Sequence, residues 1–297
     1  MARDYESAPL SLSCSDWSFS LLPHEQALDL IAALGFTGVD VMLRGNKGGS
    51  HIFPEDVVRD VPAWAGRLEE RAASRGLKIS DVFWIPWTGF EVMAPNNPDP
   101  AEVERGRDVF AAMLELAVRV GAPGVTTLPG IDWPHETHEQ SLTRAAEELA
   151  RRAAQARDRG IRFSVEPAVA SVCHTPEDGV RLCELAPELE LTLDYTHYVC
   201  RGFSEAEIDP LVPHARHMHT RGGADERLQA SMATNSIDYE RLVDVLLAAG
   251  YTGYLTVEYV WVDWENLNDV DVLSETVMMR DRLSAKLSGL TQASRNG

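Results

Sequence analysis

Short apolar runs alternate with longer amphipathic segments along most of the chain. The runs have the length and composition of buried parallel strands, and the segments between them have helical spacing. Eight runs are expected to be strands: Leu10–Ser13, Gly38–Met42, Ile79–Ile85, Gly124–Leu128, Arg162–Glu166, Leu189–Asp194, Ala215–His219 and Tyr254–Tyr259. Such alternation predicts a sheet of parallel strands connected by helices.

The intervening segments carry helix signals. Apolar residues from Ala27 to Leu34 recur at i, i+3, i+4 and i+7, and Gly35 then ends the pattern. Thr175 to Asp178 combines an N-cap hydroxyl, a proline at the first helical position and an acidic residue, which predicts a helix start. Helices are also expected over 138–159 and from Ile237 to Ala249, and a long loop over 86–100.

Eight strand-then-helix units predict a closed (β/α)₈ TIM barrel that forms a single domain over residues 1–297. The length of 297 residues suits this fold, which takes about 250 residues plus insertions. An open doubly wound sheet with a dinucleotide site would carry a Gly-x-Gly-x-x-Gly turn after its first strand. The first strand runs instead into Cys14-Ser15-Asp16-Trp17. The pattern therefore favours the barrel.

The overall charge limits the classes of partner. The formal net charge of −19 repels phosphate backbones and anionic lipids, so we expect no nucleic-acid partner and no membrane association. Four cysteines without a Cys-x-x-Cys pair are too few for a disulfide framework. The first residues lack the apolar core of a signal peptide, and no run is long enough to cross a bilayer. We therefore expect a cytoplasmic protein.

Polar side chains follow the apolar runs of four consecutive strands. Glu166 ends the fifth, Asp194 the sixth, His219 the seventh and Glu258 lies near the end of the eighth. In a barrel these strand ends converge on the face where active sites are built. A single acidic residue at a strand end is more often a helix cap or an ion-pair partner. Four in register predict a shared site.

Three carboxylates in a small space repel one another, at a cost of several kcal/mol unless a cation neutralises them. Glu166, Asp194, His219 and Glu258 are therefore expected to bind one divalent metal ion. An oxygen-rich set with one nitrogen suits Mn²⁺ or Mg²⁺ and also accommodates Co²⁺ or Zn²⁺. The donor set alone does not choose between them, and Mn²⁺ is our first expectation. His217 points to the same side of its strand as His219 and is expected to support it from below.

The series Val-Glu166-Pro, Leu-Asp194-x-x-His197, His217-x-His219 and Val-Glu258 resembles the xylose isomerase-like TIM-barrel superfamily. Within it, the chain is similar to the sugar isomerases and epimerases that include ketose 3-epimerases and inosose-processing enzymes. The resemblance spans all eight strands.

This resemblance implies that Glu166 and Glu258 also act as an acid/base pair and that His197 contacts substrate. It further implies a substrate-binding arginine shortly after the seventh strand. Arg221 and Arg227 compete for that role, because Gly222-Gly223 obscures the alignment, and we favour Arg227.

Aromatic residues near the strand ends favour a neutral sugar over a sugar phosphate. Trp261 and Trp264 follow the eighth strand without basic neighbours, and Trp84, Trp87 and Phe90 lie around the third. Such rings are platforms for sugars or aglycones, although any one of them can instead plug the barrel rim. Trp87 and Trp261 are taken as candidate substrate-binding residues.

The chemistry that needs this set of groups is proton transfer next to a carbonyl. A cation stabilises the enediolate that forms when a carboxylate removes the α-proton, and general acid–base help contributes about 10²–10⁴ in rate. The resulting hypothesis is a metal-dependent isomerase or epimerase of a neutral keto-sugar or cyclitol. The alternative is a lyase or dehydratase that eliminates a group from a 3-keto-sugar, keto-glycoside or inosose.

Two further classes fit less well. An endonuclease of the same superfamily needs a larger metal cluster and a basic face, which the charge of −19 opposes. A non-catalytic subunit would have no use for the acid/base pair. The expected partner is thus a small sugar, and the loop over 86–100 could join two copies in a homo-oligomer.

Overall fold

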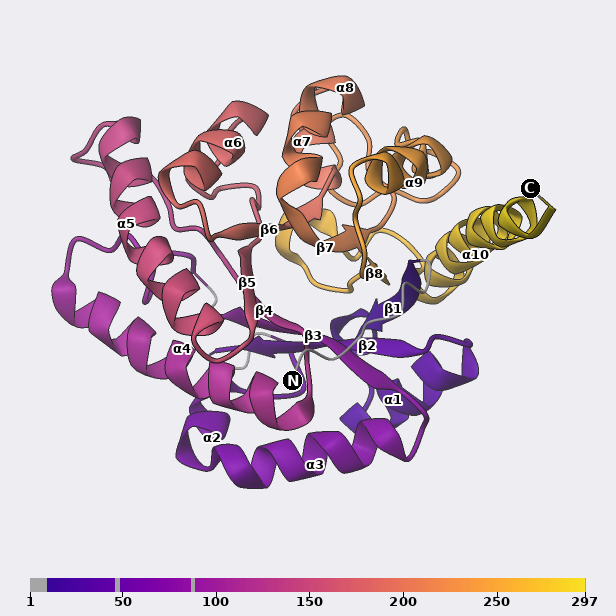
Figure 1. Cartoon of the computed structure of the whole chain (residues 1–297), viewed down its shortest axis with the longest axis horizontal. Helices are drawn as coiled ribbons and strands as arrows, with labels where there is room; N and C mark the ends of the chain where they lie inside the picture. The colour runs from indigo at the N-terminus through magenta and orange to yellow at the C-terminus, as the bar shows by residue number, and fades with distance from the viewer. Residues whose placement is uncertain (1–9, 46–48, 87–88, 297) are drawn as a thin grey trace.

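The computed structural model describes residues 10–45, 49–86 and 89–296. Eight parallel strands close into a barrel in which each strand pairs with the next and β8 pairs with β1 (Figure 1). Their bounds are β1 Ser11–Ser15, β2 Gly38–Arg44, β3 Lys78–Ile85, β4 Gly124–Thr127, β5 Arg162–Val165, β6 Glu190–Asp194, β7 Ala215–Thr220 and β8 Tyr254–Val257. The predicted TIM barrel is confirmed, and each predicted strand overlaps an observed one.

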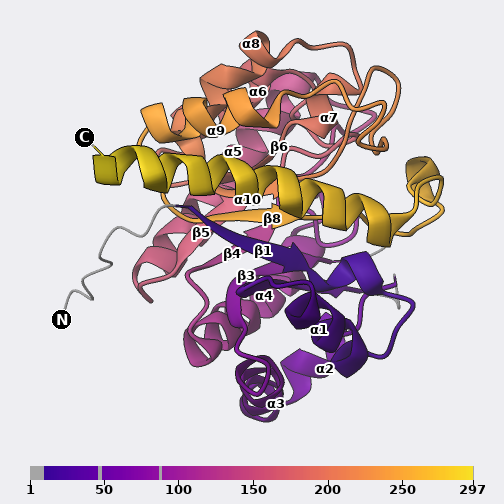
Figure 2. The same ribbon diagram turned by 90° about the vertical axis from the view of Figure 1, so that its right-hand side faces the viewer.

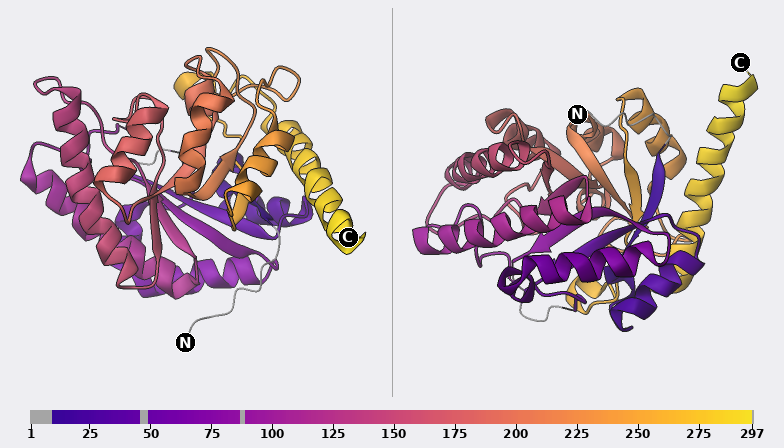
Figure 3. Two further views of the ribbon diagram at one scale, coloured as in Figure 1. Left: turned by 45° about the horizontal axis from the view of Figure 1, so that its top comes forward. Right: turned by 60° about the horizontal axis from the view of Figure 1, so that its bottom comes forward.

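Helices surround this barrel on the outside. They are α1 His24–Ala33, α2 Pro54–Arg59, α3 Val61–Ala73, α4 Pro100–Val120, α5 His138–Arg157, α6 Pro176–Leu185, α7 Thr196–Val199, α8 Glu205–Ile208, α9 Tyr239–Ala248 and α10 Val272–Asn296, with short 3₁₀ helices η1 Asp16–Phe19, η2 Asp209–His214 and η3 Trp264–Asn266. The last helix, α10, packs against α9 and lies beside β1 and β8 (Figure 2). Its C-terminal end points away from the barrel (Figure 3). Within the described residues, no helix is both long and apolar enough to span a bilayer.

The helix starts follow from local hydrogen bonding. The hydroxyl of Thr175 accepts from the backbone N–H of Asp178, and the Asp178 carboxylate accepts from the N–H of Thr175 at 2.8 Å. This capping box, with Pro176 at the first helical position, begins α6 where the sequence predicts. Thr137 and Gln140 form a second capping box at the start of α5. Both helices are thereby fixed at the barrel face that carries the strand ends.

Side chains on the outer face of the strands pack against the helices. Trp84 of β3 is fully buried there and lies 6.5 Å from Phe110 of α4 between ring centroids. Because strand residues alternate in direction, its neighbour Phe83 points into the barrel instead. The expectation that Trp84 adds aromatic surface around the site is therefore wrong, since it belongs to the core between sheet and helices.

Candidate metal centre

The four predicted ligands lie at the same end of the barrel. Glu166 and Glu258 directly follow β5 and β8, Asp194 is the last residue of β6, and His219 lies in β7. Ligand atoms of Glu166, His219 and Glu258 all lie within 4.8 Å of one another, and so do those of Glu166, Asp194 and His197. All five side chains are buried. The structure therefore brings the predicted set together, with Glu166 shared by both groups.

His219 occupies the middle of this cluster. Its Nδ1 lies 2.7 Å from Oε1 of Glu166 and 3.2 Å from Oε2 of Glu258. Burial acts to lower the pKa of His219, but the carboxylates of Glu258 and Glu166 outweigh it and raise that pKa well above its usual value. Burial also raises the pKa of Glu258 to about 8. The cluster thus holds extra protons when no metal is bound.

The side chains fit a divalent ion. Oε1 of Glu258 is buried and has no hydrogen-bond partner among the described residues, which costs free energy unless a ligand or ion contacts it. Separations of 2.7 and 3.2 Å between neighbouring donor atoms resemble the edge of about 3 Å in an octahedron with 2.1 Å bonds. Three carboxylates and one imidazole form a hard, oxygen-rich donor set of the kind that suits Mn²⁺ or Mg²⁺.

Two further groups face the cluster. His197 Nδ1 accepts a hydrogen bond from the backbone N–H of Val169 at 3.0 Å, which leaves the ring proton on Nε2. This Nε2 lies 3.8 Å from both Glu166 and Asp194. Burial lowers the pKa of His197, so the ring is neutral near pH 7. A neutral ring in this tautomer can donate one hydrogen bond toward the cluster.

The arginine in the cluster is Arg221. Its Nη2 lies 3.0 Å from Oδ2 of Asp194 and 3.3 Å from Nε2 of His197, and the side chain is buried. Arg227, which the sequence analysis favoured, is exposed and lines a separate pocket with Thr234 and Asp271. The geometry therefore favours Arg221 over Arg227.

The glycine pair lets the backbone pass through a narrow gap directly after Arg221. A Cβ atom on Gly222 would lie 2.3 Å from the carbonyl oxygen of Ala230, and one on Gly223 would lie 2.7 Å from the Thr196 side chain. Only glycines allow the chain to pass through this gap. The backbone N–H of Gly222 donates to the Tyr259 hydroxyl at 2.7 Å, which fixes the segment directly after Arg221.

Asp40 of β2 is a member of the site that the sequence analysis missed. Its Oδ2 lies 2.9 Å from Nε2 of His217 and 3.1 Å from Nε2 of His219. His217 also contacts the Thr256 hydroxyl at 2.9 Å, and it lies in the barrel beneath His219 as expected. A carboxylate inside the apolar run of the second strand was the available signal.

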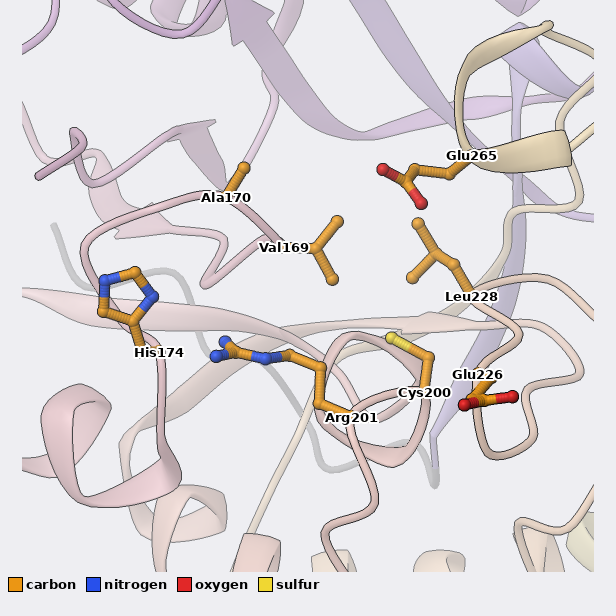
Figure 4. A pocket seen from close by; sticks show the side chains of 8 residues that line it. All are labelled: Val169, Ala170, His174, Cys200, Arg201, Glu226, Leu228 and Glu265. Carbon is orange, nitrogen blue, oxygen red and sulfur yellow. The ribbon is translucent and has the colours of Figure 1, made fainter.

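A pocket of about 420 Å³ opens at this end of the barrel. Figure 4 shows its lining, with Val169, Leu228 and Glu265 around the opening and the guanidinium of Arg201 extending toward the His174 side. Leu228 belongs to a buried apolar cluster with Trp17, Phe83 and Val260, and the partly buried Val169 packs against that cluster. The lining of this pocket is therefore mixed, with apolar side chains beside the charged groups of Arg201, Glu226 and Glu265.

Two of the predicted tryptophans, Trp261 and Trp264, are partly exposed. Trp261 is 43% exposed and Trp264 37%, and the Trp264 ring meets Phe90 edge-on at 5.8 Å. Trp261 and Trp264 follow β8, and Phe90 lies in the loop after β3. Trp87 lies outside the described residues.

Comparison with known proteins gives the family. No curated protein sequence matches the chain. Among solved structures, it is similar to an L-ribulose 3-epimerase (20% identity, 96% of this chain and 97% of that one, TM-score 0.71) and to a D-psicose 3-epimerase from Clostridium cellulolyticum H10 (14% identity, 94% and 99%, TM-score 0.71). It is also similar to a xylose isomerase-like TIM-barrel protein from Mycobacterium smegmatis in complex with magnesium (15% identity, 97% and 100%, TM-score 0.68). At these identities the structures share the fold. The sequence profile of the xylose isomerase-like TIM-barrel family matches residues 28–280, and the chain belongs to that family.

Proposed function

We propose that the protein is a divalent-metal-dependent isomerase or epimerase that moves a proton next to the carbonyl of a neutral keto-sugar or cyclitol. One observation carries the proposal. Oxygens of Glu166 and Glu258 lie 2.7 and 3.2 Å from Nδ1 of His219. A carboxylate oxygen of Asp194 lies within 4.8 Å of one of Glu166. Two carboxylates beside one metal position are what acid–base transfer between two carbons, or between two faces of one carbon, requires.

Glu166, Asp194, His219 and Glu258 would hold the metal, with Mn²⁺ the first expectation. When bound, the ion would polarise the carbonyl oxygen of the substrate as a Lewis acid and so acidify the neighbouring C–H bond. The magnesium complex of a protein with the same fold supports a divalent ion in this barrel.

The two glutamates would carry the proton. Oε1 of Glu258 has no hydrogen bond among the described residues, so it can accept a proton from a substrate carbon. Glu166 would then serve as the acid that returns a proton, or the roles would reverse for the opposite stereochemistry. Both residues are buried, and this exclusion of water limits loss of the transferred proton.

His197 and Arg221 would position the substrate. The proton on Nε2 of His197 points toward the cluster and can be donated to a substrate hydroxyl or carbonyl oxygen. Arg221 holds Asp194 in place and adds a positive charge where negative charge develops on oxygen. The pocket wall carries two carboxylates, Glu226 and Glu265, against the one guanidinium of Arg201, and this negative balance supports a neutral substrate over a phosphorylated sugar.

The aromatic rim favours a second candidate, a lyase that eliminates a group from a keto-glycoside or an inosose. Trp261 and Trp264 are both more than a third exposed, and Phe90 packs against Trp264. Such rings can bind an aglycone beyond the sugar. Elimination begins with the same removal of a proton next to a carbonyl, so the same glutamates would serve.

The test is proton exchange in D₂O. The Mn²⁺-loaded protein is incubated with ketohexoses and inososes, and carbon-bound deuterium is measured by NMR and mass spectrometry. We expect deuterium incorporation next to the carbonyl, at a rate that falls by about 10²–10⁴-fold in Glu166→Gln and in Glu258→Gln. The control Glu69→Gln, which changes an exposed glutamate of α3, should keep the rate of wild type. Elimination from keto-glycosides without exchange in any ketose would assign the lyase. Neither reaction with any of these substrates, or activity unchanged by both active-site variants, would refute the proposed chemistry.

A further inference from the structure

We propose a second metal site, of the Zn²⁺ type, formed by Asp132, His138 and His174. Asp132 lies in the loop after β4, His138 is the first residue of α5, and His174 lies in the loop between β5 and α6. The three can offer ligand atoms within 4.8 Å of one another. None of them belongs to the cluster at Glu166 and His219. They are contributed by the β4–α5 and β5–α6 connections, and His174 also lines the pocket shown in Figure 4.

The spacing of the donor atoms suits a tetrahedral ion. Nδ1 of His138 lies 3.0 and 3.3 Å from the two oxygens of Asp132, and Nε2 of His174 lies 2.6 Å from Asp132 Oδ2. Bonds of 2.0–2.1 Å to a tetrahedral Zn²⁺ place neighbouring ligand atoms about 3.4 Å apart. The three groups would need to separate by less than about 1 Å, which half-exposed side chains can do by small rotations. The side chains of Asp132 and His174 are each 37% exposed, so an ion can enter from solvent.

Asp178 is not one of the three ligands, but it contacts the second ring nitrogen of His138. Its Oδ1 lies 3.0 Å from Nε2 of His138, while its Oδ2 accepts from the backbone N–H of Thr175. A histidine that ligates a metal through one nitrogen commonly donates its other N–H to a carboxylate, which fixes the tautomer. The capping box of α6 therefore holds Asp178 where it would direct Nδ1 of His138 toward the ion.

The donor set and charge indicate the class of ion. Two imidazoles and a carboxylate leave one position of a tetrahedron for water or another ligand, as in many Zn²⁺ sites. Asp132 and Asp178 together carry two negative charges, which balance the two positive charges of a divalent ion. An ion here would link the two loops and fix His174 at the pocket wall.

The test measures binding of Zn²⁺ alone, by equilibrium dialysis and metal analysis of the full chain. We expect wild type to bind two Zn²⁺ per chain, and His174→Ala and Asp132→Asn to bind one. His135→Ala, an exposed histidine in the same loop, is the matched control and should still bind two. Asp178→Asn should keep the second ion with an affinity about 10- to 100-fold lower.

A second measurement separates this site from the barrel cluster. With Co²⁺, wild type should show the strong visible absorption of a tetrahedral ion, and His174→Ala should lose it while His135→Ala keeps it. Failure of the barrel site alone would give one ion in wild type and none in His174→Ala. Equal stoichiometry and equal Co²⁺ spectra in wild type, His174→Ala and Asp132→Asn would overturn the second site, whatever the barrel cluster does.

Discussion

His219 and Asp40 are joined by a hydrogen bond inside the barrel, with Nε2 of the ring 3.1 Å from Oδ2 of the carboxylate. The same oxygen also contacts His217 at 2.9 Å. Because Nε2 faces Asp40, the other ring nitrogen faces Glu166 and Glu258. Strand β2 thus orients the only imidazole among the four predicted ligands.

The first prediction concerns Asp40→Asn. An amide cannot accept charge-assisted hydrogen bonds from both histidines, so His219 becomes a weaker and less well oriented ligand. We expect the affinity for Mn²⁺ at the barrel site to fall about 10- to 100-fold, without loss of the site itself. Calorimetric titration measures the change. Asp56→Asn, on the surface of α2, makes the same change in net charge and should bind as wild type does. An unchanged affinity in Asp40→Asn would show that the contact does not tune the ligand.

The second prediction is a pH dependence of stability in the metal-free protein. Burial raises the pKa of Glu258 to about 8, from 4.5 in an unfolded chain, so the folded state binds the extra proton between these values. This contribution is complete below pH 4.5 and is lost as pH rises through 8. The raised pKa of His219 acts in the same direction at higher pH. In EDTA, the free energy of unfolding should fall from pH 5 to 8, by at most about 1.4 kcal/mol per pH unit for each group.

Denaturant titrations at several pH values measure this slope. Mn²⁺ should suppress it, because a bound cation compensates the carboxylate charge at every pH in this range. In Glu258→Gln, the part of this pH slope that comes from Glu258 should vanish. A slope of opposite sign in EDTA would mean that the carboxylates of the cluster are compensated without a metal.

The fold could be predicted because each of its determinants is local. Apolar runs such as Gly124–Leu128, and helix starts such as Thr175 to Asp178, are visible in a few consecutive residues. The strand-end positions of Glu166, Asp194, His219 and Glu258 follow from the same pattern, since parallel strands in a barrel end on one face. Their convergence is therefore a consequence of topology.

The remaining parts of the site depend on packing between distant segments. Asp40 precedes His219 by 179 residues. A carboxylate inside an apolar run is visible in the sequence, but nothing near it indicates that its partners lie in β7. The choice between Arg221 and Arg227 depends on the path of Gly222 past Ala230. Trp84 and Phe83 are adjacent aromatic residues, and only the pairing register decides which faces the interior.

The third prediction separates the two arginines. Arg221→Lys keeps a positive charge but loses the guanidinium that reaches Asp194 Oδ2 at 3.0 Å, so kcat/KM should fall by about 10- to 100-fold, the equivalent of about one charged hydrogen bond. Arg227→Lys should leave kcat/KM within about twofold of wild type, since the side chain is exposed in a different pocket. Steady-state kinetics on the substrate found in the exchange experiment gives both values. The reverse result would restore Arg227 as the substrate-binding arginine.

The fourth prediction tests the passage of the chain beside Arg221. In Gly222→Ala the new methyl group would meet the carbonyl oxygen of Ala230 at 2.3 Å and the Tyr259 hydroxyl at 2.7 Å, so the backbone must move. We expect a loss of about 1–3 kcal/mol in the free energy of unfolding. A larger relative loss of kcat/KM should accompany it, because Arg221 is the adjacent residue.

Gly66→Ala in α3 is the matched control, since its methyl group meets nothing within 4 Å and an alanine favours the helix by about 1 kcal/mol. If Gly222→Ala were as stable and as active as Gly66→Ala, the tight passage would not be what directs Arg221 into the cluster.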